Sequence, residues 1–266
     1  MKEALRYIAR SLADMFLPRT CVVCGRHLTP DEDHLCLECL SDIPLTRFWT
    51  LERNPMADRF NASLTAAPEE PYCYALALFN YNSESGWRHV TPALKYRGDL
   101  SVGRYFAGML ADRLALCPWL SDVDLVVPVP LHWRRCLQRG YNQAGIIAEV
   151  VAARMGAGLD ARLLRRVRYS RSQTRTGVAL KRENVSGAFA VRATCAGAAH
   201  PVQSTAWQQA SRRGTGAGAP EPRHILLIDD VCTTGSTLGA CHDALRGVFS
   251  SDVRISAATL AFVVPA

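Results

Sequence analysis

The sequence has no long hydrophobic run. Among its 266 residues, no stretch approaches the ~18 uncharged apolar residues of a transmembrane helix, so no membrane insertion is expected. The N-terminus also lacks the continuous apolar segment of a signal peptide, because Glu3, Arg6, Arg10 and Asp14 interrupt it. Hydrophobic residues make up 48% of the chain, which excludes a wholly disordered protein, and the length predicts one large domain and a small one.

Acidic residues are scarce in one part of the chain. Residues 131–192 contain 13 Lys and Arg but only 3 Asp and Glu, a net charge of +10. The rest of the chain, with 18 basic and 21 acidic residues, has a net charge of −3. Nucleic acid, a membrane surface or a polyphosphate ligand could each use this basic block, and a solvated basic surface is the alternative.

Residues 3–16 have the spacing of an amphipathic helix. Leu5, Ile8, Leu12 and Met15 recur at intervals of three and four residues. This pattern favours a helix packed on the body of the protein over one that anchors it to a membrane.

Four of the ten cysteines form two CxxC pairs, with Cys21 and Cys24 in the first and Cys36 and Cys39 in the second. The C-x2-C-x11-C-x2-C spacing predicts a tetrahedral Zn²⁺ site, and four thiolates would make it structural rather than catalytic. The metal would supply the folding energy of a segment too short to have its own core. Two disulfides are the alternative, which the lack of a secretion signal disfavours. We interpret most of the other cysteines as small buried apolar residues.

The rest of the chain alternates apolar runs with helical patterns. We expect strands over 72–81, 123–129, 225–230 and 253–264, and helices over 100–116, 142–155 and 236–249. Such alternation predicts an α/β fold with a mainly parallel sheet.

These patterns divide the chain into four parts. They are an N-terminal helix (1–17), a zinc-binding module (18–43), a Pro-rich polar linker (44–71) and the α/β domain (72–266). Within the last part, residues 193–222 are rich in Ala, Gly, Ser and Pro without periodicity. This composition predicts a mobile insertion.

The most specific segment is ILLIDDVCTTGST, residues 225–237, in which an apolar strand ends in Asp229 and Asp230 and leads through a small-residue loop into a helix. Gly235 allows a close backbone approach, and the amides of residues 233–237 can converge on a phosphate at the helix N-terminus. The acids would repel a phosphate, so ribose hydroxyls, a Mg²⁺ ion or both suit them better. The segment has neither the GxxxxGK nor the GxGxxG pattern.

These thirteen residues resemble the phosphoribosyl-pyrophosphate (PRPP) loop of type I phosphoribosyltransferases. In that family the two acids hold the ribose hydroxyls and the following loop holds the 5′-phosphate. The resemblance implies a PRPP site formed by Asp229, Asp230, Thr233, Thr234, Gly235, Ser236 and Thr237.

Two further segments, VVPVPLHWRRCLQRGYNQA (126–144) and RSQTRTGVALKRENVSGAF (171–189), together with the four-Cys module, resemble the ComF or ComFC-like competence family. The resemblance covers residues 18–41 and 72–266 apart from the insertion. It implies a zinc-ribbon joined to a phosphoribosyltransferase domain. Family members tied to natural transformation act on the cytoplasmic side of DNA uptake, which implies a cytoplasmic protein here.

The resemblance also implies roles in the basic block, because a departing pyrophosphate needs cations. The implied catalytic residues are Arg134, Arg135, Arg175 and Lys181. The first two follow a strand where related transferases have their pyrophosphate loop, although exposed arginines at a helix start are the alternative. The other two fall where the family has a hood loop, residues 169–184. Lys95 is a further candidate. No residue stands out as a general base: His132 is the nearest candidate in the sequence, and a surface or structural histidine is the alternative.

Two classes of function remain open. The first is a Mg²⁺-dependent phosphoribosyltransferase with an unidentified acceptor. The second is a non-catalytic protein on the same scaffold that binds single-stranded DNA or a competence helicase. In the second case Arg165, Arg166 and Arg168 would contact DNA phosphates.

Overall fold

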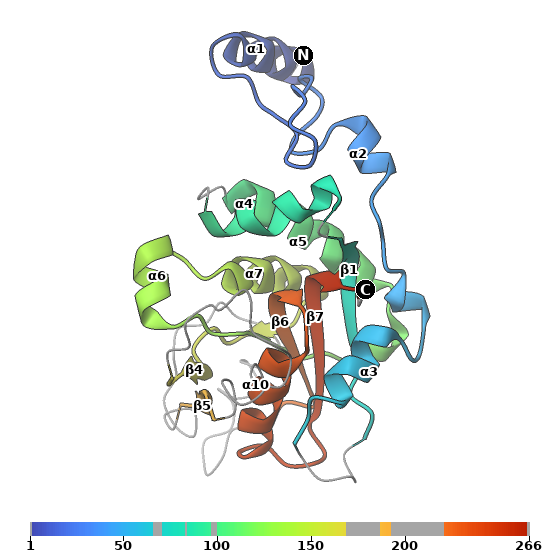
Figure 1. Cartoon of the computed structure of the whole chain (residues 1–266), viewed down its shortest axis with the longest axis vertical. Helices are drawn as coiled ribbons and strands as arrows, with labels where there is room; N and C mark the ends of the chain where they lie inside the picture. The colour runs from blue at the N-terminus through green and yellow to red at the C-terminus, as the bar shows by residue number, and fades with distance from the viewer. Residues whose placement is uncertain are drawn as a thin grey trace.

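The computed structural model describes residues 2–65, 71–82, 84–96, 100–168, 187–192 and 221–264. Its main part is a five-stranded sheet in the order β1-β7-β6-β2-β3, in which every neighbouring pair is parallel (Figure 1). The strands are β1 (Ala75–Tyr81), β2 (Leu125–Pro128), β3 (Gly158–Leu159), β6 (His224–Cys232) and β7 (Arg254–Val263). The expected α/β fold with a parallel sheet is confirmed.

The central strands are buried on both faces. Residues 225–228 of β6 and 257–258 of β7 have no exposed surface, and β2 is buried over its whole length. Parallel strands covered on both faces read as continuous apolar runs rather than alternating ones, which is why the sequence located them.

Helices surround the sheet. They are α4 (Val90–Tyr96), α5 (Leu100–Ala115), α6 (Trp133–Arg139), α7 (Gln143–Met155) and α10 (Ser236–Arg246), with short 3-10 turns η2 (Gly86–His89) and η3 (Pro118–Leu120). The helices expected over 100–116, 142–155 and 236–249 are confirmed as α5, α7 and α10.

The strand order locates a crevice. The chain crosses from β1 through α5 to β2, and from β2 through α7 to β3, in one direction along the sheet. From β6 through α10 to β7 it crosses in the opposite direction. Because such connections are right-handed, α10 covers the opposite face from α5 and α7. The direction therefore reverses between β2 and β6, and open α/β sheets bind ligands at the carboxyl ends of such strands.

A two-stranded antiparallel hairpin, β4 (Leu164–Arg166) and β5 (Phe189–Val191), lies beside α10. Arg165 pairs with Ala190 in its register. The hairpin thus brings a basic strand close to the helix that follows β6.

The segment expected as a linker, residues 44–71, contains regular structure. Residues 48–61 contain η1 (Phe48–Thr50) and helix α3 (Pro55–Asn61), and Asn54 caps α3 by accepting from the amide of Met56 at 3.1 Å. The Asn54 side chain also donates to the carbonyl of Ala75 in β1 at 2.9 Å, and Phe60 is fully buried. The segment is therefore structured at this point, with polar residues that serve as a cap and a strand contact. The other expected boundaries stay predictions.

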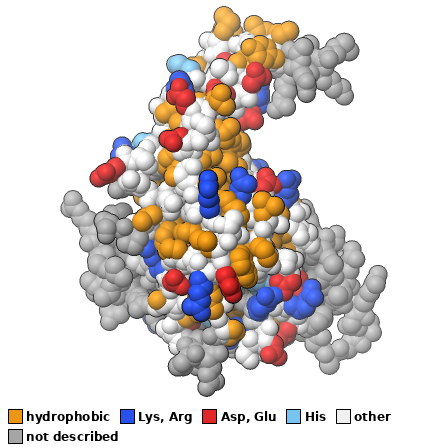
Figure 2. Space-filling view, turned by 90° about the vertical axis from the view of Figure 1, so that its right-hand side faces the viewer, with side chains coloured by type: hydrophobic (Ala, Val, Ile, Leu, Met, Phe, Trp, Pro, Cys, Tyr) orange, Lys and Arg blue, Asp and Glu red, His pale blue; other side chains and the backbone are white. Residues whose placement is uncertain are grey.

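Helix α1 (Lys2–Phe16) is confirmed, but its expected packing is wrong for the described side chains. Its polar edge contacts the four-Cys segment: Arg10 Nη1 donates to the carbonyl of Pro30 at 3.0 Å, and Asp14 Oδ1 lies 2.8 Å from Arg19 Nε. The apolar edge is exposed, and Figure 2 shows hydrophobic side chains at this end of the molecule. Its exposed residues are Tyr7, Ile8, Leu12, Met15 and Phe16. Within the described ranges, no helix has both the length and the apolar character to cross a bilayer.

The amino ends of the strands carry a buried polar array. His224, which is 1% exposed, has Nδ1 at 2.9 Å from Asp122 Oδ1 and Nε2 at 2.8 Å from Ser256 Oγ. Burial lowers the pKa of His224 to about 4. This array lies at the edge of the sheet opposite the crevice, so it supports the fold rather than the site.

Candidate functional site

The loop between β6 and α10 has the geometry expected of an anion cradle. Gly235 precedes α10 in the left-handed region, with φ +76°, and a Cβ there would lie 3.0 Å from the carbonyl oxygen of Arg59. Thr234 Oγ1 and Ser236 Oγ are hydrogen-bonded at 2.9 Å. The loop therefore needs glycine at this position and presents hydroxyls and the first amides of α10 at the carboxyl end of β6.

Two acids lie in front of this loop. Asp229 Oδ1 accepts a hydrogen bond from the amide of Asp230 at 2.9 Å, and Asp230 Oδ2 lies 2.7 Å from Lys95 Nζ. Burial, followed by the charge of Asp230, raises the pKa of Asp229 to about 8. Lys95, a candidate from the sequence, thus pairs with the acids from helix α4.

The basic segment that leads from β2 into α6 also starts at the carboxyl edge of the sheet. Pro128 of β2 is paired with Ile228 of β6, and Val129 to His132 form the connection from β2 to helix α6. His132 caps this helix, α6, with Nδ1 accepting from the amide of Arg134 at 3.3 Å. Arg134 and Arg135 therefore lie in the first turn of α6, the helix that follows β2.

Electrostatic effects show that the cations are close to one another. The pKa of His132 is lowered by burial and then by the charges of Arg134, Arg166 and Arg135. The pKa of Arg166 is lowered by burial and then by Arg135, while Asp229 acts in the opposite direction. An acid of β6 and cations from α6 and β4 therefore form one cluster.

The sequence did not predict that Arg166 belongs to this cluster. The sequence groups it with Arg165 and Arg168 as a DNA contact, but its guanidinium lies 5.3 Å from the ring centre of Phe189 and the charge of Asp229 acts on it. Only the pairing of β4 with β5 turns this side chain inward, while Arg165 and Arg168 are exposed. No local sequence signal distinguishes the three.

Helix α3 provides another contact that the sequence did not predict. Arg59 Nη1 donates to the carbonyl of Thr233, and Ser63 Oγ lies 3.2 Å from the carbonyl oxygen of Gly235. The segment between Asn54 and Ser63 thus forms the rear wall of the loop that follows β6.

Other predicted residues lie outside the described part of the chain. These are Arg175 and Lys181 of the hood loop and all but the last two residues of the 193–222 insertion. His242 is described and is fully buried, with Nε2 at 3.5 Å from Cys73 Sγ and its ring edge-on to Phe60. Its side chain packs inside the core.

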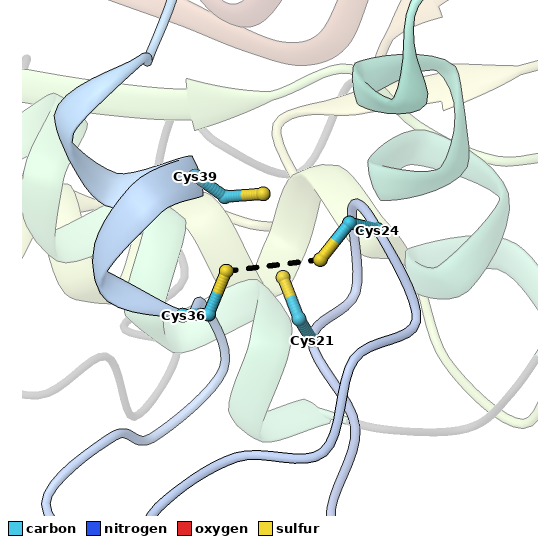
Figure 3. Close-up of side chains that lie close together, drawn as sticks. All are labelled: Cys21, Cys24, Cys36 and Cys39. Atoms are coloured by element: carbon cyan, nitrogen blue, oxygen red, sulfur yellow. Dashed lines mark hydrogen bonds between the residues drawn. The ribbon is translucent and has the colours of Figure 1, made fainter.

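The four predicted cysteines come together in a second site. Their sulfur atoms all lie within 4.8 Å of one another, and Figure 3 shows that they point toward a common centre. Cys24 Sγ and Cys36 Sγ are 3.7 Å apart, close to the separation of about 3.8 Å set by a tetrahedral site with Zn–S bonds of about 2.3 Å. Cys36 precedes helix α2 (Leu37–Ser41), which carries Cys39. The cluster can bind a structural metal ion.

A cation stabilises one of these thiolates. Burial opposes ionisation of Cys36, but hydrogen bonds from Arg26, whose Nη2 lies 3.1 Å from the sulfur, and from the amide of Cys39 outweigh it. The pKa of Cys36 falls to about 6. Thiolates are the form that binds metal, and Cys36 ionises most readily, whereas the pKa of Cys39 is raised by burial and by the neighbouring cysteines.

Among the other described cysteines, Cys73, Cys117, Cys232 and Cys241 are buried and Cys136 is half-buried. Most are therefore small core residues, as expected.

The fold and the two sites define a class of protein: a five-stranded parallel α/β domain with an acid-tipped loop, joined to a four-Cys module. This architecture agrees with a zinc-ribbon and a phosphoribosyltransferase-like fold.

Comparison with known proteins narrows this class. The chain is 30% identical over 115 residues to the DNA utilization protein YhgH of Salmonella typhi and 28% identical over 115 residues to that of Escherichia coli K12. It is 24% identical over 132 residues to Competence protein F of Haemophilus influenzae. These homologues support a ComF-like family for the chain. The matches span 40% of the two YhgH proteins and 48% of Competence protein F, so less than half of each relative is covered. No model of a known protein family matches the chain.

Proposed function

We propose that the crevice between β2 and β6 binds PRPP. The observation that carries the proposal is that acidic and basic side chains occur together where the direction of the strand connections reverses, between β2 and β6. Asp229 and Asp230 lie near the carboxyl end of β6, ahead of the Gly235 loop, and the charges of Arg135 and Asp229 both act on Arg166. The amides of the loop would hold the 5′-phosphate, the acids the ribose hydroxyls and the arginines the diphosphate.

The same arrangement supports phosphoribosyl transfer to an acceptor nitrogen. The nitrogen lone pair would form the bond to C1′ while the C1′–O bond breaks, pyrophosphate leaves with that electron pair, and the acceptor proton passes to solvent. Arg134 and Arg135 are the proposed leaving-group contacts, with Arg175 and Lys181 as contacts from the hood loop. Charge builds on the departing pyrophosphate, so fixed cations there lower the barrier.

Two metal ions belong to this proposal. Carboxylate oxygens are ligands that Mg²⁺ prefers, and the Lys95 ammonium beside Asp230 supports a preference for cations at this place. Mg²⁺ would neutralise diphosphate charge when it is bound with PRPP. Zn²⁺ is proposed for the four-Cys cluster, because four thiolates at tetrahedral separations suit it.

The biological setting proposed is DNA uptake in natural transformation, in the cytoplasm. The names of the relatives, a DNA utilization protein and a competence protein, support it. Contacts with single-stranded DNA or with a helicase would suit the exposed Arg165 and Arg168, which lie on β4 and just beyond it.

Thermal unfolding tests the PRPP site. Millimolar PRPP with Mg²⁺ should raise the Tm by several degrees, because a ligand at 100 times its Kd adds about 2.7 kcal/mol of stability. The Asp229→Asn/Asp230→Asn variant should lose the shift, while Asp252→Asn, an exposed acid on a distant loop, should keep it. No shift in the wild-type protein would contradict the proposal.

Gel retardation of single-stranded DNA separates the DNA role from the PRPP role. Arg165→Gln/Arg168→Gln should weaken a salt-sensitive interaction and leave the PRPP shift intact, because these side chains are exposed. Absence of retardation even at low salt would remove the DNA-binding part of the proposal.

A further inference from the structure

Arg59 makes hydrogen bonds at the carboxyl ends of two neighbouring strands, β6 and β7. Cys232 of β6 and Phe262 of β7 are register partners, so the next residues, Thr233 and Val263, are neighbours at the carboxyl edge of the sheet. Arg59 Nη1 donates to the carbonyls of both, at 2.6 Å for Val263, and its guanidinium lies 4.2 Å from the ring centre of Phe262. A planar cation thus stacks on one strand and reaches the carbonyls that follow both.

The end of α3 also lies against the start of α10. Ser63 Oγ is 2.7 Å from the carbonyl oxygen of Phe60 and 3.2 Å from that of Gly235, and its own carbonyl would be 2.8 Å from a Cβ placed at Gly239. The contact is too close for any side chain at this point of α10. Helix α3 therefore fixes where α10 begins.

Anion binding by a backbone loop requires a particular orientation. Amide N–H groups must face the anion, so the carbonyls between them must face away. A carbonyl that faces away from a ligand and into the protein needs a donor there. At Thr233 the donor is the guanidinium of Arg59, on the side of the loop opposite its amides.

We propose that Arg59 is a positioning residue of the phosphate loop. It binds the carbonyl of Thr233 from the rear and so holds the amides that follow in the orientation that receives the 5′-phosphate. Arg59 itself does not touch the ligand. The inference deepens the PRPP site and rests on it for its ligand, but the loop conformation can be measured in the protein alone.

Hydrogen–deuterium exchange measures that conformation without any ligand. Arg59→Met should raise the exchange rates of the Thr234–Thr237 amides at least severalfold, because the carbonyl that organises them loses its donor. Arg53→Met is the matched control, since Arg53 also stacks on an aromatic ring, 4.6 Å from the centre of Tyr72, but at some distance from the loop. Exchange rates at 234–237 that are unchanged in a folded Arg59→Met protein would overturn the inference.

Ligand affinity supplies the second readout, with ribose 5-phosphate and PRPP as probes. Arg59→Met should weaken both about tenfold and by the same factor, because both carry the 5′-phosphate. Arg59→Lys keeps the charge but not the planar fork, so it should recover part of the affinity, and Arg53→Met should bind as the wild type does. Equal weakening by Arg53→Met, or wild-type affinity in Arg59→Met, would overturn the inference. A wild-type protein that binds neither probe would instead count against the PRPP proposal, and the exchange experiment would still decide the role of Arg59.

Discussion

Lys95 Nζ lies 2.7 Å from Asp230 Oδ2, which joins helix α4 to the acid pair near the carboxyl end of β6. Neither side chain is more than 29% exposed, so the pair is only partly screened by solvent. The acids at the carboxyl edge of the sheet therefore depend on a residue more than a hundred positions earlier in the chain.

Replacing this lysine should reveal the cost of two neighbouring acids without their cation. We expect Lys95→Met to lower the free energy of unfolding by about 1–2 kcal/mol at pH 8, and by less at pH 5, where a carboxyl can take up a proton. Urea denaturation at the two pH values measures the difference. Arg104→Met removes an exposed pair with Glu149 and should change little, so equal effects of both variants would contradict the expectation.

Asp229 should make the protein less stable as the pH rises. Its pKa is about 8 in the folded protein and 3.8 in the unfolded chain, so the folded state retains a proton that the unfolded state has lost. The associated stability is fully present below pH 3.8 and is lost as the pH rises toward 8. Asp229→Asn cannot ionise and should unfold a few degrees above the wild type at pH 9, with a smaller difference at pH 5. A difference that does not vary with pH would show that Asp229 is already ionised at neutral pH.

His224 should have the opposite dependence. Its pKa is lowered to about 4 from 6.5, because burial disfavours the charged ring, so the unfolded state binds the proton first. The stability it contributes is present above pH 6.5 and is lost as the pH falls toward 4. Proton NMR of the His224 ring should show no titration between pH 7 and pH 5. A midpoint near 6.5 would mean that the ring carries a charge beside Asp122.

The four-Cys cluster should hold one metal ion per chain. We expect mass spectrometry of the intact protein or elemental analysis to show about one Zn²⁺, reduced strongly in Cys36→Ser because three thiolates bind it far less tightly. Removal by a chelator should unfold residues 18–43 and leave the sheet folded, since the large core lies elsewhere. Cys136→Ser changes a half-buried cysteine outside the cluster and is the control. Equal metal content in the two variants would exclude the cluster as the binding site.

The parts that sequence predicted well are those in which the chemistry is local. The acids, the glycine and the hydroxyls of the loop are consecutive, and the CxxC spacing defines the cluster before any tertiary contact. The continuous apolar runs of buried parallel strands located β2, β6 and β7 to within a few residues.

Tertiary contacts determined the rest. Asn54 and Arg59 lie in a segment whose composition is that of a polar linker. Only the fold shows that Asn54 caps a helix and that Arg59 binds the carbonyl of Thr233, 174 residues away. Arg166 turns inward because β4 pairs with β5, while its neighbour Arg165 remains exposed. The apolar edge of α1 was expected to be covered, but Arg10 and Asp14 direct the polar edge toward the protein instead.

The strand order also has a consequence for how the chain is made. Strands β6 and β7 leave the ribosome after β1, β2 and β3, yet they lie between β1 and β2 in the sheet. Until residues 224–263 have emerged, β1 has no strand to pair with and β2 can pair only with β3. Formation of the sheet must therefore follow synthesis of β7, and a nascent chain halted before β7 would present unpaired strand edges to chaperones.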